Sequence, residues 1–197
     1  MGKIFYQIMR PITNLYVDLV FRPKIYGKEL IPKSGGIIFA GNHLTDMDQT
    51  IVIRSTRRSV RFLTKKELYH GFLGVILKWY DTIPVDRDNK EKNFSMGLSK
   101  EALLKGDAIN IFPEGKRNKT DDILLPFKYG AVSLAKKTNT FIVPFGIYGK
   151  MKPFKKRVIV NFGEPFKVDG DLDEANNNLR KIIIDLIEKG RSEYEEK

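Results

Sequence analysis

The chain of 197 residues contains no cysteine and only two histidines. The absence of cysteine excludes a thiol nucleophile, a disulfide and a cysteine-bound zinc ion. Two histidines do not supply a histidine-rich metal cluster either. We therefore expect a functional site without metal, and a single domain whose length suffices to bury a hydrophobic core without covalent cross-links.

Long apolar runs are also missing. The longest, such as IIFA and FLGVIL, fall far short of the roughly 20 residues that a membrane-spanning helix needs. The N-terminus has neither the apolar stretch nor the small-residue cleavage site of a signal peptide. We therefore expect no transmembrane helix and a place on the cytoplasmic side of the cell membrane.

Positive charge, by contrast, is abundant: 35 Lys and Arg against 24 Asp and Glu give a formal net charge of +11. Such an excess favours partners that carry phosphates, namely nucleic acid, an anionic membrane surface or phosphorylated substrates. The sequence has no helix-turn-helix, zinc-finger or RNP pattern, so we expect no nucleic acid partner. One basic run either attracts such a surface or forms a solvated face; it consists of Arg54, Arg57, Arg58, Arg61, Lys65 and Lys66.

The N-terminal segment has apolar residues at the spacing of an amphipathic helix, and they are Ile4, Ile8, Ile12, Leu15 and Leu19. Basic residues flank this stripe, as in helices that lie in the interface of an anionic membrane. The alternative, from composition alone, is an ordinary helix packed on the core. We predict that residues 1–22 form a membrane-docking segment, and that Pro11 bends it or splits it in two.

From residue 23 to residue 197, short apolar runs alternate with segments of helical period. This alternation predicts one α/β domain with a central mixed, largely parallel sheet flanked by helices. In such sheets, ligands bind beyond the carboxyl ends of the strands. The expected strands cover residues 36–40, 60–63, 82–85, 108–112, 140–145 and 158–162, and the expected helices cover residues 46–55, 72–80, 91–105, 129–137 and 173–194.

The segment GNHLTDMDQT, residues 41–50, places His43 directly after an expected strand and Asp48 five residues further on. On a continuous helix, five residues turn by about 140°, so the two side chains would point apart. If Thr45 instead caps a helix that begins at Asp46, Asp48 can reach back to the imidazole. A carboxylate on Nδ1 leaves Nε2 free as a general base. The alternative is a plain capping box from Thr45 to Asp48, with His43 as a loop residue.

Two further loops follow expected strands. FPEGKRN, residues 112–118, contains Gly115, which permits close backbone approach, and Arg117, a planar fork for phosphate. Glu114 is able to pair with Arg117 or to accept a hydrogen bond from a substrate hydroxyl. TIPVDRDN, residues 82–89, presents a second guanidinium at Arg87. Taken alone, each loop is better explained as a solvated, charged turn.

Taken in order, NHLTDMD, TKKEL with TIPVDR, FPEGKR and IVPFGIYG resemble the four sequence blocks of the glycerolipid acyltransferase family, and most closely those of the 1-acylglycerol-3-phosphate (lysophosphatidic acid) acyltransferases. The resemblance spans roughly residues 32–165. It implies that His43 and Asp48 are the catalytic pair. It also implies that Arg87, Glu114, Gly115 and Arg117 bind the phosphate of the acceptor.

The resemblance further implies an activity: transfer of a fatty acyl group from a thioester of coenzyme A or acyl carrier protein to the hydroxyl of 1-acylglycerol-3-phosphate. The product would be phosphatidic acid, for phospholipid biosynthesis, and no cofactor beyond the acyl donor is implied. Lys116 replaces a small hydroxyl residue of the usual third block, and so adds a phosphate contact or marks a different head group. Glycerol 3-phosphate or another lysophospholipid stays open as acceptor; hydrolysis and nucleic acid binding are more distant alternatives.

Overall fold

Seven strands form one sheet: β1 (Lys24–Tyr26), β2 (Ile37–Gly41), β3 (Val60–Lys65), β4 (Ile83–Val85), β5 (Ala108–Ile111), β6 (Phe141–Tyr148) and β7 (Ile159–Phe162). The computed structural model describes residues 2–85, 92–149 and 158–195. The strand order is β1-β7-β6-β2-β5-β3-β4, and all neighbours are parallel except β6 and β7. The predicted mixed, largely parallel sheet is therefore confirmed.

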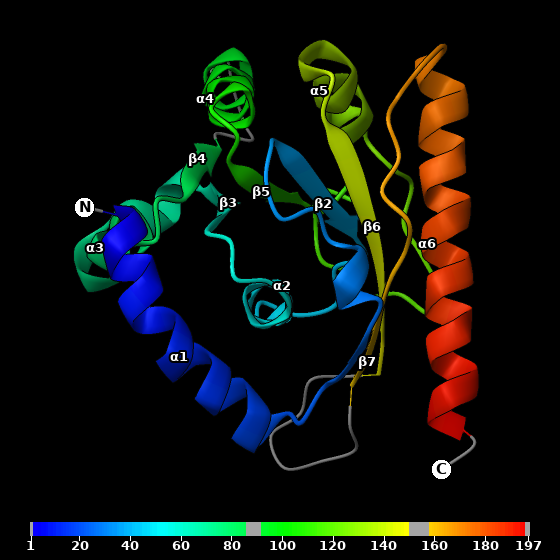
Figure 1. Cartoon of the computed structure of the whole chain (residues 1–197), viewed down its shortest axis with the longest axis horizontal. Coiled ribbons are helices and arrows are strands. Elements are labelled where there is room, and N and C mark those ends of the chain that lie inside the picture. Colours follow the sequence, from blue (N-terminus) through cyan, green and yellow to red (C-terminus); the bar gives the residue numbers. More distant parts are fainter. Residues whose placement is uncertain (1, 86–91, 150–157, 196–197) are drawn as a thin grey trace.

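Helices cover both faces of this sheet: α1 (Gly2–Val20), α2 (Asp48–Ser55), α3 (Gly71–Trp79), α4 (Lys92–Leu104), α5 (Gly130–Thr138) and α6 (Leu172–Glu195), with 3-10 turns η1 (Lys28–Leu30) and η2 (Lys66–Tyr69). One core cluster joins α1 and α2 to the sheet, and a second joins α4, α5 and α6 to it. Figure 1 shows α1 and α6 on opposite sides of the strands. β2, β5 and β7 are buried throughout because both of their faces are covered.

The first helix, α1, continues through Pro11 without a break, so the predicted split at this residue is wrong. Proline removes one backbone donor and crowds the carbonyl four residues earlier. Tertiary packing offsets that cost, because α1 lies against α2 and α3 and buries Tyr6 and Val17. The rings of Phe5 and Trp79, from α1 and α3, are centred 4.7 Å apart.

The opposite face of α1 is open to solvent, because Ile4, Ile8, Ile12, Leu15 and Leu19 are each between 58% and 70% exposed. The alternative in which this stripe packs on the core is therefore wrong. Within the residues that the structure describes, no helix combines the length and the apolar character that a membrane span requires. The stripe is thus an exposed apolar surface along one face of α1.

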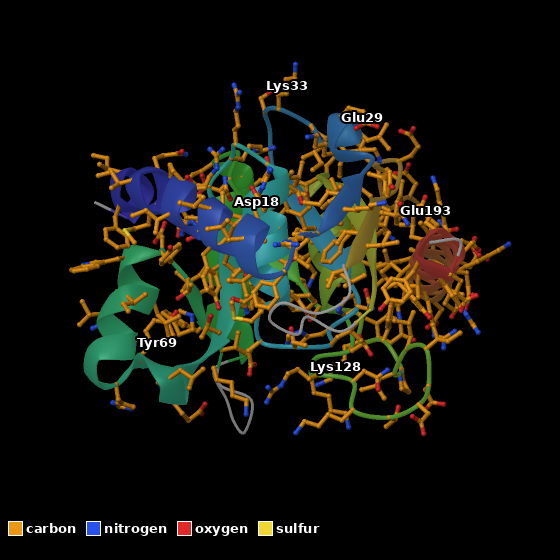
Figure 2. The ribbon with its side chains drawn as sticks, turned by 90° about the horizontal axis from the view of Figure 1, so that it is seen from below. Asp18, Glu29, Lys33, Tyr69, Lys128 and Glu193 are labelled. Atoms are coloured by element: carbon orange, nitrogen blue, oxygen red, sulfur yellow. The ribbon has the colours of Figure 1, made fainter. Side chains whose placement is uncertain are left out.

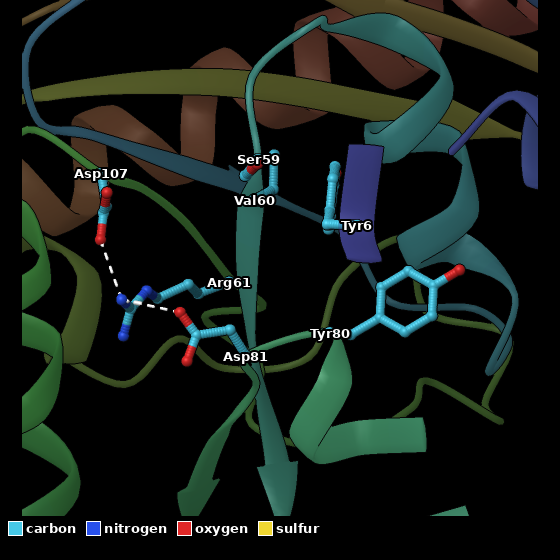
Figure 3. A pocket seen from close by; sticks show the side chains of 7 residues that line it. All are labelled: Tyr6, Ser59, Val60, Arg61, Tyr80, Asp81 and Asp107. Atoms are coloured by element: carbon cyan, nitrogen blue, oxygen red, sulfur yellow. Dashed lines mark ion pairs between the residues drawn. The ribbon is translucent and has the colours of Figure 1, made fainter. Parts of the chain in front are cut away.

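Three residues of the predicted basic run, Arg54, Arg58 and Arg61, form contacts within the molecule. Arg61 forms ion pairs with Asp81 and Asp107 at 2.7 and 3.1 Å, as Figure 3 shows. Arg54 pairs with an aspartate of α1, and Arg58 donates to backbone carbonyls of two surrounding loops. These three side chains therefore stabilise the fold through contacts within the molecule.

The carboxyl ends of the parallel strands gather at one edge of the sheet. In Figure 2, Lys33, which precedes β2, and Lys128, which lies in the long loop after β5, are at opposite ends of the molecule. β2, β3 and β5 run in the same direction, so the segments that follow them lie toward the end of the molecule where Lys128 is found. This edge therefore brings together His43 and residues 112–118, as expected for the ligand site of an open α/β sheet.

Candidate active site

His43 and Asp48 are in direct contact: Nδ1 of the imidazole lies 3.0 Å from Oδ2 of the carboxylate. β2 ends at Gly41 and α2 begins at Asp48, so the two side chains meet across the turn between strand and helix. An ionised carboxylate only accepts hydrogen bonds, so Nδ1 carries the proton and Nε2 has a free lone pair. The side chain of Asp48 is fully buried, and that of His43 is 13% exposed. The basic nitrogen is therefore on the ring edge that faces away from the carboxylate.

The turn that holds this pair is built around Asp48. Its Oδ2 also accepts the backbone N–H groups of Leu44 and Thr45, at 2.6 and 2.8 Å, and its Oδ1 accepts the Thr45 hydroxyl at 2.8 Å. These donors satisfy a carboxylate that would be costly to bury alone. Thr45 does not cap a helix at Asp46 as predicted, because α2 begins two residues later, with Met47 at the N-cap. The carboxylate instead combines part of a capping box with the contact to His43.

Residues 112–118 form hydrogen bonds with both backbone groups of His43. The N–H of His43 donates to Oε1 of Glu114 at 2.8 Å, and its carbonyl accepts the N–H of Asn118 at 2.7 Å. The other oxygen of Glu114 accepts the N–H of Leu125 at 2.9 Å. Burial raises the pKa of the Glu114 carboxyl, although the N–H donors and His43 act in the opposite direction. Both oxygens of Glu114 are therefore engaged by backbone N–H groups, and this buried carboxyl connects the loop to His43.

The ring of Phe112 lies flat against the imidazole of His43, with centroids 4.0 Å apart and an interplanar angle of 6°. Phe112 follows β5 directly, so a rigid central strand fixes the position of this ring. Together with the Asp48 contact on its edge, the stack restricts both the tilt and the rotation of the imidazole. The base is thus held in one orientation before a substrate arrives.

Gly115 turns the loop at a φ of 70°, a value that side chains with a Cβ rarely adopt. A Cβ at this position would lie 2.9 Å from the side chain of Lys128. Lys128 is itself fixed, because its N–H donates to the carbonyl of Pro113 at 2.9 Å. The glycine thus allows a lysine to approach the loop beside His43.

Two pockets meet at His43. The first, which we call the apolar pocket, has a volume of about 270 Å³ and is walled mainly by Phe62, Leu63, Val85, Ile111 and Phe112. It lies where β3 separates from β5: their pairing ends at Phe62 and Asn110, after which β3 pairs with β4. The second, the basic pocket, has a volume of about 760 Å³ and includes Lys65, Lys116, Arg117 and Lys119. His43, Gln49, Leu63 and Lys65 line both.

Arg117 forms an ion pair with Asp46 rather than with Glu114, so the predicted Glu114 pairing is wrong. Both partners are substantially exposed, and pairs of this kind contribute only about 0–1 kcal/mol. A phosphate can therefore replace Asp46 at little cost. Lys116 lines the same pocket, and Gly115 lines the apolar one. Arg87 lies outside the described residues.

Sequence reasoning missed several polar residues at this site, namely Gln49, Asn110 and Lys128, and named Lys65 only as part of the basic run. For Asn110 there was a signal, because an asparagine interrupts the apolar run AINIF. Lys128 stands between Phe127 and Tyr129 and is brought to the site by the long loop after β5, which no local pattern specifies. Gln49 follows Asp48 on the first turn of α2 and was taken as an ordinary helical residue.

The fold and the site define the class of protein. A family model described as Acyltransferase matches residues 22–148, which include β1 to β6 and every site residue named above. The chain belongs to this acyltransferase family.

Particular relatives carry more specific names. A 1-acyl-sn-glycerol-3-phosphate acyltransferase of Borreliella burgdorferi is 33% identical over 141 residues, which cover 71% of this chain and 56% of that protein. The chloroplastic 1-acyl-sn-glycerol-3-phosphate acyltransferase BAT2 of Brassica napus is 29% identical over 196 residues, which cover 92% of this chain and 56% of that protein. The chain thus spans about half the length of these curated relatives.

The crystal structure of the 1-acyl-sn-glycerophosphate (LPA) acyltransferase PlsC from Thermotoga maritima has a similar fold. The TM-score is 0.71, and the match covers 90% of this chain and 75% of that one. Sequence identity is only 20%, so this likeness establishes the architecture of the chain and not its substrate.

Proposed function

We propose that the chain transfers a fatty acyl group from a thioester of coenzyme A or acyl carrier protein to the free hydroxyl of 1-acylglycerol-3-phosphate, with phosphatidic acid as product. One observation carries the proposal. The His43 and Asp48 pair stands where an apolar pocket and a basic pocket meet, so one base faces room for an acyl chain and room for phosphates. The names of the curated relatives point to the same reaction.

The proposed chemistry is direct transfer. Nε2 of His43 takes the proton of the acceptor hydroxyl while the oxygen attacks the thioester carbonyl, and the imidazolium that forms is stabilised by Asp48. When the tetrahedral intermediate collapses, the carbon–sulfur bond breaks and the leaving sulfur takes the proton back from Nε2. General-base help of this kind contributes about 10²–10⁴-fold to the rate. No step calls for a metal ion or a cofactor beyond the acyl donor.

The two pockets supply separate binding for the two ends of the reaction. The carbonyl of the transferred acyl group must lie at His43, where it reacts. The apolar pocket extends from that point between β3 and β5 and offers space for the rest of the acyl chain. The acceptor hydroxyl must reach the same base, and the basic pocket offers Lys116 and Arg117 for its phosphate. Arg117 suits this task because its planar fork binds phosphate through paired hydrogen bonds. We expect Arg87 to add a second guanidinium.

We also propose that the protein acts as a peripheral enzyme on the cytoplasmic side of the cell membrane. The apolar stripe of α1 is exposed, and burial of such side chains in an interface adds to the attraction of surface cations for anionic lipid. Residues 1–22 then dock the catalytic domain, residues 23–197, onto the surface that contains its acceptor and its product.

The test is an assay of thioester consumption in which only the acceptor is varied. Wild-type protein receives acyl-coenzyme A, or acyl carrier protein loaded with the same chain, together with lysophosphatidate, glycerol 3-phosphate or another lysophospholipid. We expect thiol release that depends on lysophosphatidate and equals phosphatidic acid formed. Release with a different acceptor would change the proposed substrate, and release without any acceptor would indicate a hydrolase.

A further inference from the structure

Asn110 is a buried polar residue on the inner strand β5, and its side-chain amide finds no hydrogen-bond partner among the described residues. Its side chain is 2% exposed, and neither its amide nitrogen nor its amide oxygen finds a partner in the part of the chain that the structure describes. Its neighbours across the sheet are Phe39 on β2 and Phe62 on β3, which offer no polar side-chain atom. An unpaired buried amide costs about 1–3 kcal/mol, so its presence calls for an explanation.

Another buried asparagine shows what a structural role looks like. The Asn42 amide donates to the carbonyl of Ile147 at 2.9 Å, and its oxygen accepts the N–H of the same residue at 2.8 Å. These two bonds tie the end of β2 to β6. Asn110 ties nothing together, so the fold alone does not account for it.

The position of Asn110 supplies the explanation, because this residue lines the apolar pocket. Ala108 and Phe112 pack into the cluster beneath α1 and α2, so Asn110, midway between them on an alternating strand, faces the same side of the sheet. Two residues along a strand correspond to about 7 Å. The amide thus lies about 7 Å deeper than Phe112, the ring that stacks on His43. It is too deep for the reacting carbonyl and well placed for the chain behind it.

We propose that Asn110 determines acyl-chain specificity by binding an oxygen substituent, namely a hydroxyl, on the acyl group of the donor. A hydroxyl both donates and accepts, so it can satisfy the amide oxygen and the amide nitrogen together. A depth of about 7 Å places that hydroxyl roughly five to seven carbons from the thioester. An acyl chain without a hydroxyl leaves the amide of Asn110 unpaired, and sites built to bind a hydroxyl discriminate against analogues that lack it. This inference rests on the proposed acyl transfer.

The experiment scans a hydroxyl along an acyl chain of fixed length. Coenzyme A thioesters with the hydroxyl near the thioester, in the middle of the chain or at its end are compared with the unsubstituted chain, at constant lysophosphatidate. We expect wild-type kcat/KM to peak for the mid-chain hydroxyl, about tenfold above the unsubstituted chain. Asn110→Leu, which keeps the shape and removes the amide, should abolish the peak and use the unsubstituted chain at least as well.

Asn176→Leu is the matched control. Asn176 lies on α6, is also buried and also has an amide oxygen without a partner among the described residues, but it does not line the pocket. This variant should keep the mid-chain peak. If Asn110→Leu does not fold, the wild-type scan still tests the inference. A kcat/KM that does not change with the position of the hydroxyl overturns the assignment of Asn110, while the proposed acyl transfer stands.

Two other results overturn the inference. An equal loss of kcat/KM for every chain in Asn110→Leu would mean that Asn110 contacts a part common to all donors, such as the pantetheine arm. Absence of transfer from any thioester to any lysolipid would overturn the proposed function itself, and the specificity claim with it.

Discussion

Replacing Asp48 by asparagine separates the charge of the carboxylate from its geometry. The backbone N–H groups of Leu44 and Thr45 both point at Oδ2 and require an acceptor there, so the asparagine carbonyl should take the place of Oδ2. It then still accepts Nδ1–H of His43, while the amide nitrogen faces the Thr45 hydroxyl. The imidazole keeps its tautomer and orientation and loses only the negative charge beside it.

The expected magnitude follows from that charge. The difference between a charged and a neutral hydrogen bond, about 1 kcal/mol, sets the lower bound. The upper bound is the attraction of two unit charges about 4 Å apart at an effective dielectric constant of about 20, which is about 4 kcal/mol. We therefore expect kcat of Asp48→Asn to fall by about 5- to 1,000-fold, since each 1.4 kcal/mol changes the rate tenfold.

The assay is steady-state thioester consumption with lysophosphatidate, on variants whose folding is checked by circular dichroism and thermal melting. Asp48→Ala loses the acceptor as well as the charge, so we expect it to be slower than Asp48→Asn by at least about tenfold. Thr45→Val is the control: it removes the donor to Oδ1 and the acceptor of the Met47 N–H, but it leaves both backbone N–H donors to Oδ2 and should retain most of the activity. Equal losses in folded Asp48→Asn and Asp48→Ala would refute the claim that the amide preserves the geometry.

Three further predictions follow from other parts of the site and from α1. Arg117→Lys should raise KM for lysophosphatidate with little change in kcat, because an ammonium lacks the bidentate fork; an unchanged KM would place the phosphate elsewhere. Replacing Ile4 and Ile8 by Asp should release the folded protein from anionic vesicles, because both are exposed, whereas the control Leu104→Asp, equally exposed on α4, should leave sedimentation unchanged. Release by both variants would show a charge effect rather than docking through α1. Burial raises the pKa of Glu114 above its ordinary value of 4.5, so its contribution to stability is present below that value and is lost as pH rises through the folded pKa. Between pH 4.5 and the folded pKa, the free energy of unfolding in urea should therefore decline less for Glu114→Gln than for wild type. If both proteins lose stability equally as pH rises, the decline belongs to other groups.

The main elements of the fold could be predicted because local pattern and tertiary structure agree there. The apolar runs around Ile38 and Ile109 become strands that are covered on both faces, and their burial explains why the sequence shows no polar alternation. β1 was missed because three residues carry no detectable period and its pairing with β7 is a long-range contact. The break expected at Pro11 did not occur because packing of α1 on α2 and α3 outweighed a local preference.

The site was partly predictable for a related reason. The contact between His43 and Asp48 is local, so spacing and turn chemistry were enough to anticipate it. The position of Glu114 was not, because its partners are backbone N–H groups at residues 43 and 125, far away in the sequence. The pairing of Arg117 with Asp46 likewise depends on how two distant loops meet at one edge of the sheet.

The most direct test of the central claim is the rate of phosphatidic acid formation by His43→Ala. The His43 side chain stacks on Phe112 and contacts Asp48, so the variant should melt somewhat below wild type, and circular dichroism checks that it is folded at the assay temperature. The account predicts a loss of at least about 10²-fold, since the general base is gone while both pockets remain. A folded His43→Ala protein with near wild-type turnover would contradict the account and leave His43 as a residue of the turn alone.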